Sequence, residues 1–211
     1  MEYLEYSYLW PPRPEKAIPL ELVGFYEKRG WSSQIKMNGT GNVLAISPER
    51  KIVAMNRHNA THKLWTPTAA NEADFAKLPG NGWYVFVAEL LHSKVPGIRD
   101  VNYVHDVLVA DGHYLVGESF ADRQLRLSSL LLQGKKGKSR ELLTHWEISP
   151  TLWLAKTFVG GHRALYEKLD RPEHEGIVLK NPKAPLVMCL KQTDNASWQV
   201  KIRKQHKNFS F

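Results

Sequence analysis

Short runs of β-branched and aromatic residues recur along the chain and predict that it is built mainly from strands. Residues that favour turns separate most of these runs, and Asp111-Gly112 between two apolar runs predicts a hairpin. The predicted strands cover residues 43–46, 51–55, 83–91, 104–110, 114–117, 176–180, 186–190 and 198–203.

Apolar residues spaced three and four apart predict three helices, over residues 71–78, 121–132 and 161–169. The leucines of the second helix, Leu125 among them, are expected in the core. The chain has no internal repeat and no long linker. We therefore expect a single α+β domain over residues 1–211, mostly antiparallel sheet with helices packed on the outside.

Composition narrows the class of protein. The 211 residues are 43% apolar and 24% charged, which is ordinary for a soluble protein. No run reaches the roughly 18–20 apolar residues of a membrane span, and the acidic, aromatic N-terminus is not a signal peptide. The single cysteine, Cys189, excludes an internal disulfide and fits a reducing compartment. We expect a cytoplasmic monomer, with Cys189 in a buried strand and no contact with a membrane.

The charge balance indicates a polyanionic partner. Lys and Arg number 29 against 21 Asp and Glu, for a net charge of +8. Such a surface attracts nucleic acid by neutralising phosphates. Cations gather at residues 134–140, which include Lys135, Lys136 and Lys138, and again at residues 201–207. Either run could also be a solvated charged face.

Lys36 is the first candidate for chemistry. It follows the apolar Ile35 and precedes Asn38 and a Gly39-Thr40-Gly41 turn, so it resembles a reactive amine mounted at a strand end. A solvated lysine in an ordinary loop is the alternative.

Three later strands carry charges at their ends. Glu89 ends an apolar run, Glu175 and Lys180 bracket another, and a glycine after Glu175 would let a ligand approach the backbone. Lys201 and Arg203 are two residues apart and therefore share one strand face, as two cations directed at a phosphate would. Taken singly, each segment also fits a charged strand face.

In this order, five segments resemble motifs I, III, IIIa, IV and V of the covalent nucleotidyltransferases, which include DNA ligases, RNA ligases and capping enzymes. The segments are 36–39, the strand with Glu89, and residues 103–108, 175–180 and 201–203. The resemblance covers residues 30 to 204. It implies an ATP-grasp-like adenylation domain, with two mainly antiparallel sheets and flanking helices around an ATP cleft.

The resemblance also implies roles. Lys36 would attack the α-phosphorus of ATP, expel pyrophosphate and carry AMP, which requires a neutral amine favoured by neighbouring cations and partial desolvation. Lys180, Lys201 and Arg203 would supply that charge and stabilise the phosphorus centre. The remaining implied contacts are Glu89 to the ribose, Glu175 to Mg²⁺ and Arg57 to phosphate.

Several positions depart from the ligase pattern. Asn38 replaces the usual aspartate of DNA ligases, and Gly39-Thr40-Gly41-Asn42 displaces by one the asparagine of phage-type RNA ligases. His105 stands where an aromatic ring would stack on adenine, with Tyr103 as the alternative. Gln34 occupies a position near the adenine edge. These departures favour the RNA ligase branch over DNA ligases.

Chain length completes the expectation. Only 35 residues precede Lys36 and eight follow Arg203. We expect ATP rather than NAD as donor, no C-terminal OB domain, and a viral or mobile-element origin. The leading hypothesis is an ATP-dependent RNA ligase joining 3′-OH and 5′-phosphate ends. The alternatives are a minimal DNA ligase and a non-catalytic nucleic-acid-binding relative.

Overall fold

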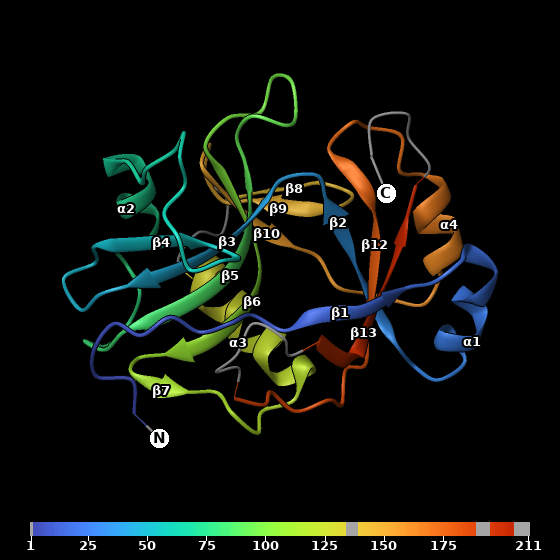
Figure 1. Ribbon diagram of the computed structural model, residues 1–211, viewed down its shortest axis with the longest axis horizontal. Helices are drawn as coiled ribbons and strands as arrows, with labels where there is room; N and C mark the ends of the chain where they lie inside the picture. The colour runs from blue at the N-terminus through green and yellow to red at the C-terminus, as the bar shows by residue number, and fades with distance from the viewer. Residues whose placement is uncertain (1, 134–138, 189–194, 205–211) are drawn as a thin grey trace.

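Two β-sheets form most of the molecule, with short helices around them (Figure 1). This computed structural model describes residues 2–133, 139–188 and 195–204. The five-stranded sheet has the order β1 (Arg13–Ala17), β13 (Asn195–Arg203), β12 (His174–Lys180), β2 (Ser32–Met37) and β11 (Phe158–Val159).

The eight-stranded sheet is built around four long central strands. Its order is β4 (Ile52–Asn56), β3 (Thr40–Ile46), β5 (Tyr84–Leu91), β6 (Val101–Ala110), β10 (Leu152–Ala155), β9 (His145–Glu147) and β8 (Arg140–Glu141), with β7 (His113–Tyr114) paired to β6. Most neighbours in both sheets are antiparallel, but β1 pairs with β13 and β10 pairs with β6 in parallel. The sheets are therefore mixed.

The helices are few and short in the described part of the chain. They are η1 (Leu20–Leu22), α1 (Val23–Glu27), α2 (Ala69–Phe75), α3 (Phe120–Leu132) and α4 (His162–Glu167). The sequence predicted α2, α3 and α4 close to these positions. None of them has the length and apolar character of a membrane span, among the residues described.

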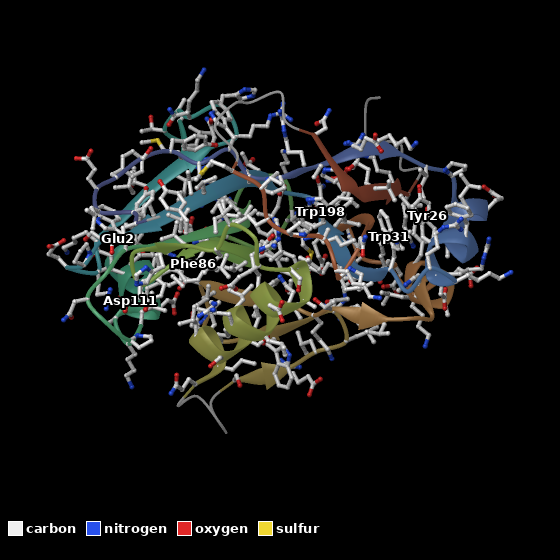
Figure 2. The ribbon with its side chains drawn as sticks, turned by 90° about the horizontal axis from the view of Figure 1, so that it is seen from below. Glu2, Tyr26, Trp31, Phe86, Asp111 and Trp198 are labelled. Atoms are coloured by element: carbon white, nitrogen blue, oxygen red, sulfur yellow. The ribbon has the colours of Figure 1, made fainter. Side chains whose placement is uncertain are left out.

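The core consists of two apolar clusters, and the second takes residues from both sheets, such as Ile177 from β12 and Val101 from β6. Phe86 is fully buried in the cluster of the eight-stranded sheet, whereas Ile177 and Ile202 belong to the cluster under the five-stranded sheet. Figure 2 shows Phe86 in one lobe and Tyr26 and Trp31 at the opposite end of the molecule. Because the apolar residues of β12 and β13 occupy alternate positions, the other face of the five-stranded sheet is left for polar side chains.

The predicted hairpin is confirmed. Asp111 and Gly112 both have positive φ values, 48° and 76°, and join β6 to β7. The predicted strand over residues 114–117 is wrong beyond Tyr114, where β7 ends. Leu125 is also not in the core, because 71% of it is exposed on the outer face of α3.

The strand predicted at residues 186–190 is wrong over residues 186–188. The backbone there bonds to the loop before α3, through Leu186 N–H to the Glu118 carbonyl and Gly117 N–H to the Leu186 carbonyl. Leu186 is buried, so the apolar run marks packing against a loop rather than a sheet. Cys189 lies outside the described residues.

A buried ion pair fastens α3 to the eight-stranded sheet. Arg123 donates Nε to Asp106 Oδ1 at 3.0 Å and NH2 to Asp106 Oδ2 at 2.9 Å, and its NH1 bonds to the Glu118 carbonyl. Burial opposes the charged form of Asp106, but the charge and hydrogen bonds of Arg123 outweigh it and hold the pKa of Asp106 below its ordinary value.

Replacing Arg123 with methionine should destabilise the protein strongly, because it leaves the buried Asp106 carboxylate without its partner. We expect a loss of about 3–5 kcal/mol in the free energy of unfolding, measured by urea denaturation. Arg126→Met is the control, since Arg126 lies on the same helix and forms an exposed pair with Glu118. That change should cost less than about 1 kcal/mol, and equal losses in the two variants would contradict the assignment.

Candidate active site

A cleft of about 630 Å³ lies between the polar face of the five-stranded sheet and the edge of the eight-stranded sheet. The strand register explains its lining. On β12, Gly176 pairs with Lys36 of β2 and with Arg203 of β13, and Val178 pairs with Gln34 and with Lys201. Paired residues point to the same face of a sheet, so these side chains all face the cleft.

Glu175 reaches this face through a bulge in β12. The register with β2 steps from His174 opposite Met37 to Gly176 opposite Lys36, which leaves Glu175 as the extra residue. Gly176 has φ = 150°, and a Cβ there would lie 1.9 Å from the Ile202 carbonyl oxygen. The neighbouring strand therefore leaves no room for a side chain at this position.

Glu175 links two of the predicted catalytic cations. Lys36 Nζ lies 2.5 Å from Glu175 Oε2, and Arg203 Nε lies 2.7 Å from Glu175 Oε1. The carboxylate is buried, while 21% of the Lys36 side chain is exposed to the cleft. Three residues that the sequence predicted for the site, Lys36, Glu175 and Arg203, thus form one contact group.

Lys201 belongs to the same group through its charge. Burial lowers the pKa of Lys201, and the nearby charges of Arg203 and Lys36 lower it further while Glu175 opposes them. Such a concentration of like charge is unfavourable unless an anion offsets it. The predicted pairing of Lys201 and Arg203 on one strand face is confirmed.

Lys180 lies at the other end of the cleft from this contact group. Its Nζ donates to Gln34 Oε1 at 2.6 Å and lies 4.6 Å from the centre of the Phe120 ring. Burial lowers the pKa of Lys180 to about 8; Asp106 opposes the shift and Arg123 adds to it. The sequence grouped Lys180 with the phosphate-directed cations, but its direct contact is with Gln34.

Gln34 is held in one orientation by its neighbours. Its Nε2 donates to Gln124 Oε1 at 2.8 Å and to Thr157 Oγ1 at 3.1 Å, while its Oε1 accepts from Lys180. Gln124 and Thr157 were not singled out by the sequence. Gln124 lies on the amphipathic α3, which was interpreted only as a packing helix.

His105 lines the cleft beside this group and has a neutral ring. Burial lowers the pKa of His105 to about 3, with Lys180 as the next contribution, and its Nδ1 lacks a hydrogen-bond partner among the described residues. The Tyr103 ring is buried in the core cluster of the five-stranded sheet, and its hydroxyl donates to the Ile35 carbonyl at 3.4 Å. Both residues line the cleft, where His105 is partly exposed and Tyr103 is buried.

The eight-stranded sheet contributes Glu89 and Arg57. Glu89 Oε1 accepts a hydrogen bond from Gly39 N–H at 3.1 Å, next to the turn after Lys36. Burial raises the pKa of Glu89, and the charges of Lys36 and Lys94 oppose that shift. Arg57 follows β4, lines the cleft beside Gly41 and donates Nε to His58 Nε2 at 3.0 Å.

The sequence missed Lys94. Its Nζ donates to the Gly39 carbonyl at 2.5 Å and it lines the same cleft. Nothing in the local sequence marked it, because it lies in a loop three residues after β5 ends.

Cations dominate the cleft. The lysines and arginines lining it, among the residues described, are Arg13, Lys36, Arg57, Lys94, Lys180, Lys201 and Arg203. The lining carboxylates are Glu89 and Glu175. This excess of positive charge fits a ligand with several negative charges, such as a nucleoside triphosphate.

Glu175 is the residue of the cleft that we expect to bind a magnesium ion. No group of three or more His, Cys, Asp or Glu residues is arranged to hold a metal within the described ranges. Mg²⁺ usually takes one or two carboxylates together with phosphate oxygens and water, so the buried Glu175 carboxylate beside Lys36 fits that role when a triphosphate is present.

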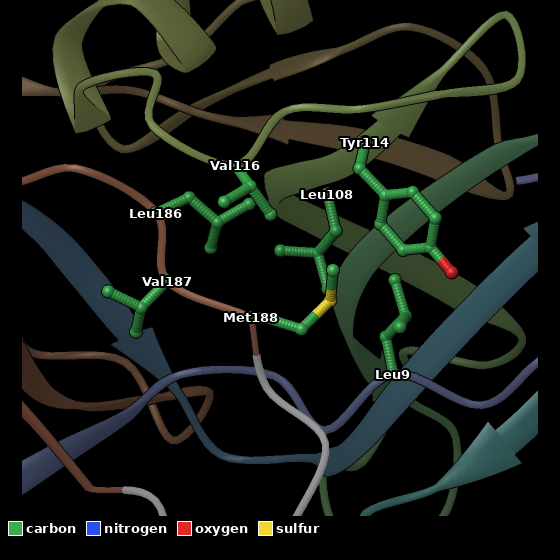
Figure 3. Close-up of a pocket in the computed structure, with 7 residues that line it drawn as sticks. All are labelled: Leu9, Leu108, Tyr114, Val116, Leu186, Val187 and Met188. Atoms are coloured by element: carbon green, nitrogen blue, oxygen red, sulfur yellow. The ribbon is translucent and has the colours of Figure 1, made fainter. Parts of the chain in front are cut away.

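Lys135, Lys136 and Lys138 lie outside the described residues. A second, apolar hollow of about 10 Å³ has room for little more than one water and is lined mainly by aliphatic side chains (Figure 3). It is a packing gap between residue 9, β6, β7 and the segment ending at Met188.

Solved DNA ligases have a similar fold. The structure of "mycobacterial DNA ligase D complexed with ATP and MES" matches with a TM-score of 0.61 and 14% identity over 94% of this chain. The Lig E DNA ligase structure matches at 0.52 and 15% over 95%, and the ATP-dependent ligase of bacteriophage T7 at 0.55 and 11% over 91%.

These matches show a shared fold only. The chain spans about 60% of the length of the first two, mycobacterial ligase D and the ligase domain of M. tuberculosis LigD, 70% of the Lig E structure and 68% of the T7 enzyme. No protein-family model and no curated protein sequence matches the chain. The fold is therefore that of ligase catalytic cores.

The titration of Lys180 tests the electrostatics of the cleft. Because burial lowers the pKa of Lys180 to about 8, half of this amine should be deprotonated near that pH, well below the ordinary value of ~10.4. NMR titration of the lysine side-chain signals measures it, with Lys180→Met to assign the resonance. Titration only above about pH 10 would show that the side chain is solvated rather than buried.

Proposed function

We propose that the protein is an ATP-dependent polynucleotide ligase that carries AMP on Lys36. The observation that carries the proposal is the contact group of Lys36, Glu175 and Arg203, with Lys201 beside it. These residues come from three adjacent strands and meet on one face of a cleft lined mostly by cations. The ligase-like fold supports the same reaction class.

The first step forms a bond between Lys36 Nζ and the α-phosphorus of ATP and breaks the bond to the leaving pyrophosphate. The attacking amine must first lose a proton to solvent. Lys201 and Arg203 stabilise the negative charge that develops at phosphorus. When bound, Mg²⁺ held by Glu175 would neutralise charge on the triphosphate.

The two later steps use the same cations. AMP passes from Lys36 to the 5′-phosphate of a polynucleotide, which restores the free amine and forms a pyrophosphate-type link. A 3′-OH then attacks the 5′-phosphorus and AMP leaves, which joins the two ends. Each step is a phosphoryl transfer at a centre that needs positive charge around it, which the cleft supplies.

At the nucleotide end, Gln34, His105 and Lys180 form the adenine-facing part of the cleft. The fixed amide of Gln34 and the neutral ring of His105 offer a polar edge and a flat surface to a base. Glu89 accepts a hydrogen bond from the ribose, and Arg57, from the same sheet, contacts phosphate.

For the polynucleotide we propose RNA ends, on the basis of Asn38 and the Gly39-Thr40-Gly41-Asn42 turn. In the structure, Asn38 N–H bonds to the Glu173 carbonyl, and Asn42 donates to Asn102 Oδ1 at 2.8 Å. The second candidate is a DNA ligase that seals nicks, which the names of the similar solved structures favour.

Labelling with ATP that is radioactive at the α-phosphate tests the covalent step. Wild type with Mg²⁺ should retain the label after denaturation, and Lys36→Ala should lose it completely, because no other residue supplies the nucleophile. Lys77→Ala, an exposed lysine outside the cleft, is the matched control and should label normally. Wild type without label would favour the non-catalytic nucleic-acid-binding alternative.

Ligation assays on matched duplexes test the substrate. Nicks with RNA at the 3′-OH end should be sealed at least ten-fold faster than all-DNA nicks of the same sequence, a difference of about 1.4 kcal/mol in activation free energy. Adenylation of Lys36 should be equal in both assays, because it precedes contact with the polynucleotide. Faster sealing of all-DNA nicks would identify the DNA ligase instead.

A further inference from the structure

The turn between β2 and β3 is held by hydrogen bonds from side chains to both backbone groups of Gly39. Gly39 N–H donates to Glu89 Oε1 at 3.1 Å, and the Gly39 carbonyl accepts from Lys94 Nζ at 2.5 Å. A Cβ at Gly39 would lie 2.5 Å from the Leu90 carbonyl oxygen and 2.7 Å from Glu89 Cγ, so the turn lies directly against β5. Both backbone groups of this glycine are thus fixed by side chains of one segment.

The loop that carries Lys94 is itself held in place. His92 Nδ1 and Asp100 Oδ1 lie 2.7 Å apart and close the loop at its base. Val95, next to Lys94, is buried, and Ile98 N–H bonds back to its carbonyl. Lys94 therefore reaches the turn from an anchored position, although its side chain is exposed.

We infer that Lys94 is a positioning residue for nucleotide transfer, which fixes the Gly39 turn behind Lys36 and places a positive charge near the Glu89 carboxyl group. The inference rests on the proposed function. Lys94 touches the Gly39 carbonyl and no reacting atom, so it acts through the turn and through Glu89.

The charges around Glu89 agree with this role. Burial raises the pKa of the Glu89 carboxyl, Glu175 adds to the rise, and Lys36 and Lys94 oppose it. The Gly39 N–H also favours the charged form. Lys36 loses its positive charge when it forms the bond to AMP, so Lys94 is then the cation that remains beside Glu89.

Three substitutions separate the two contributions of Lys94. Lys94→Met removes both the hydrogen bond and the charge, Lys94→Gln keeps a donor without charge, and Lys94→Arg keeps both. Lys77→Met is the control for loss of an exposed lysine. Thermal unfolding of each variant checks that the fold is unchanged.

The readouts are the rate of lysyl-AMP formation across pH 5 to 9 and the titration of Glu89 by NMR of ¹³C-labelled glutamate. We expect Lys94→Met to slow lysyl-AMP formation about five-fold at pH 7. Its acidic limb and the Glu89 titration should both move to higher pH, because loss of a neighbouring cation raises the pKa of a carboxyl. Lys94→Gln should show the pH shift with a smaller loss of rate, and Lys94→Arg should restore both.

The inference is overturned if Lys94→Met matches Lys77→Met in rate and pH profile, or if Lys94→Arg is as defective as Lys94→Met. Failure of the proposed function gives a different result, because wild type itself would then form no lysyl-AMP. The Glu89 titration does not require activity. An unchanged Glu89 titration in Lys94→Met would therefore sink the inference even in an inactive protein.

Discussion

The bulge at Glu175 is the constraint on which the site depends. Without the extra residue, strict alternation along β12 would place Glu175 and Lys180, five residues apart, on opposite faces of the sheet. The bulge turns Glu175 toward Lys36 and Arg203, and Gly176 alone fits the space beside the Ile202 carbonyl. The one-residue bulge thus gives Lys36 its carboxylate partner, Glu175.

Asp106, Arg123 and Lys180 form a second set of buried charges. Asp106 balances Arg123 through two hydrogen bonds, and its charge also favours the ammonium form of Lys180. Lys180 in turn fixes the Gln34 amide. Because a buried charge is costly unless it is paired, each of these groups restricts the position of the next, and the end of the cleft at Gln34 is held in one arrangement.

The sequence located most of the strands that carry the charged residues of the cleft, since β5, β12 and β13 were predicted close to their observed ranges. Lys201 and Arg203 could be placed on one face because they are two residues apart in an apolar strand. β2 was not predicted as a strand, because Ser32, Ser33 and Gln34 conceal its alternation. The contacts of Lys180 with Gln34, and of Lys94 with Gly39, depend on pairings between distant segments, which no local pattern contains.

Both sheets contribute residues to the cleft, and a two-residue link joins them next to Lys36. β2 supplies Lys36 to the five-stranded sheet, and after Asn38 and Gly39 the chain enters β3 of the eight-stranded sheet, where Glu89 and Arg57 lie. A second two-residue link, residues 156–157 between β10 and β11, also joins the two sheets. The hydrogen bonds that Gly39 forms with Glu89 and Lys94 fix the link that lies beside Lys36.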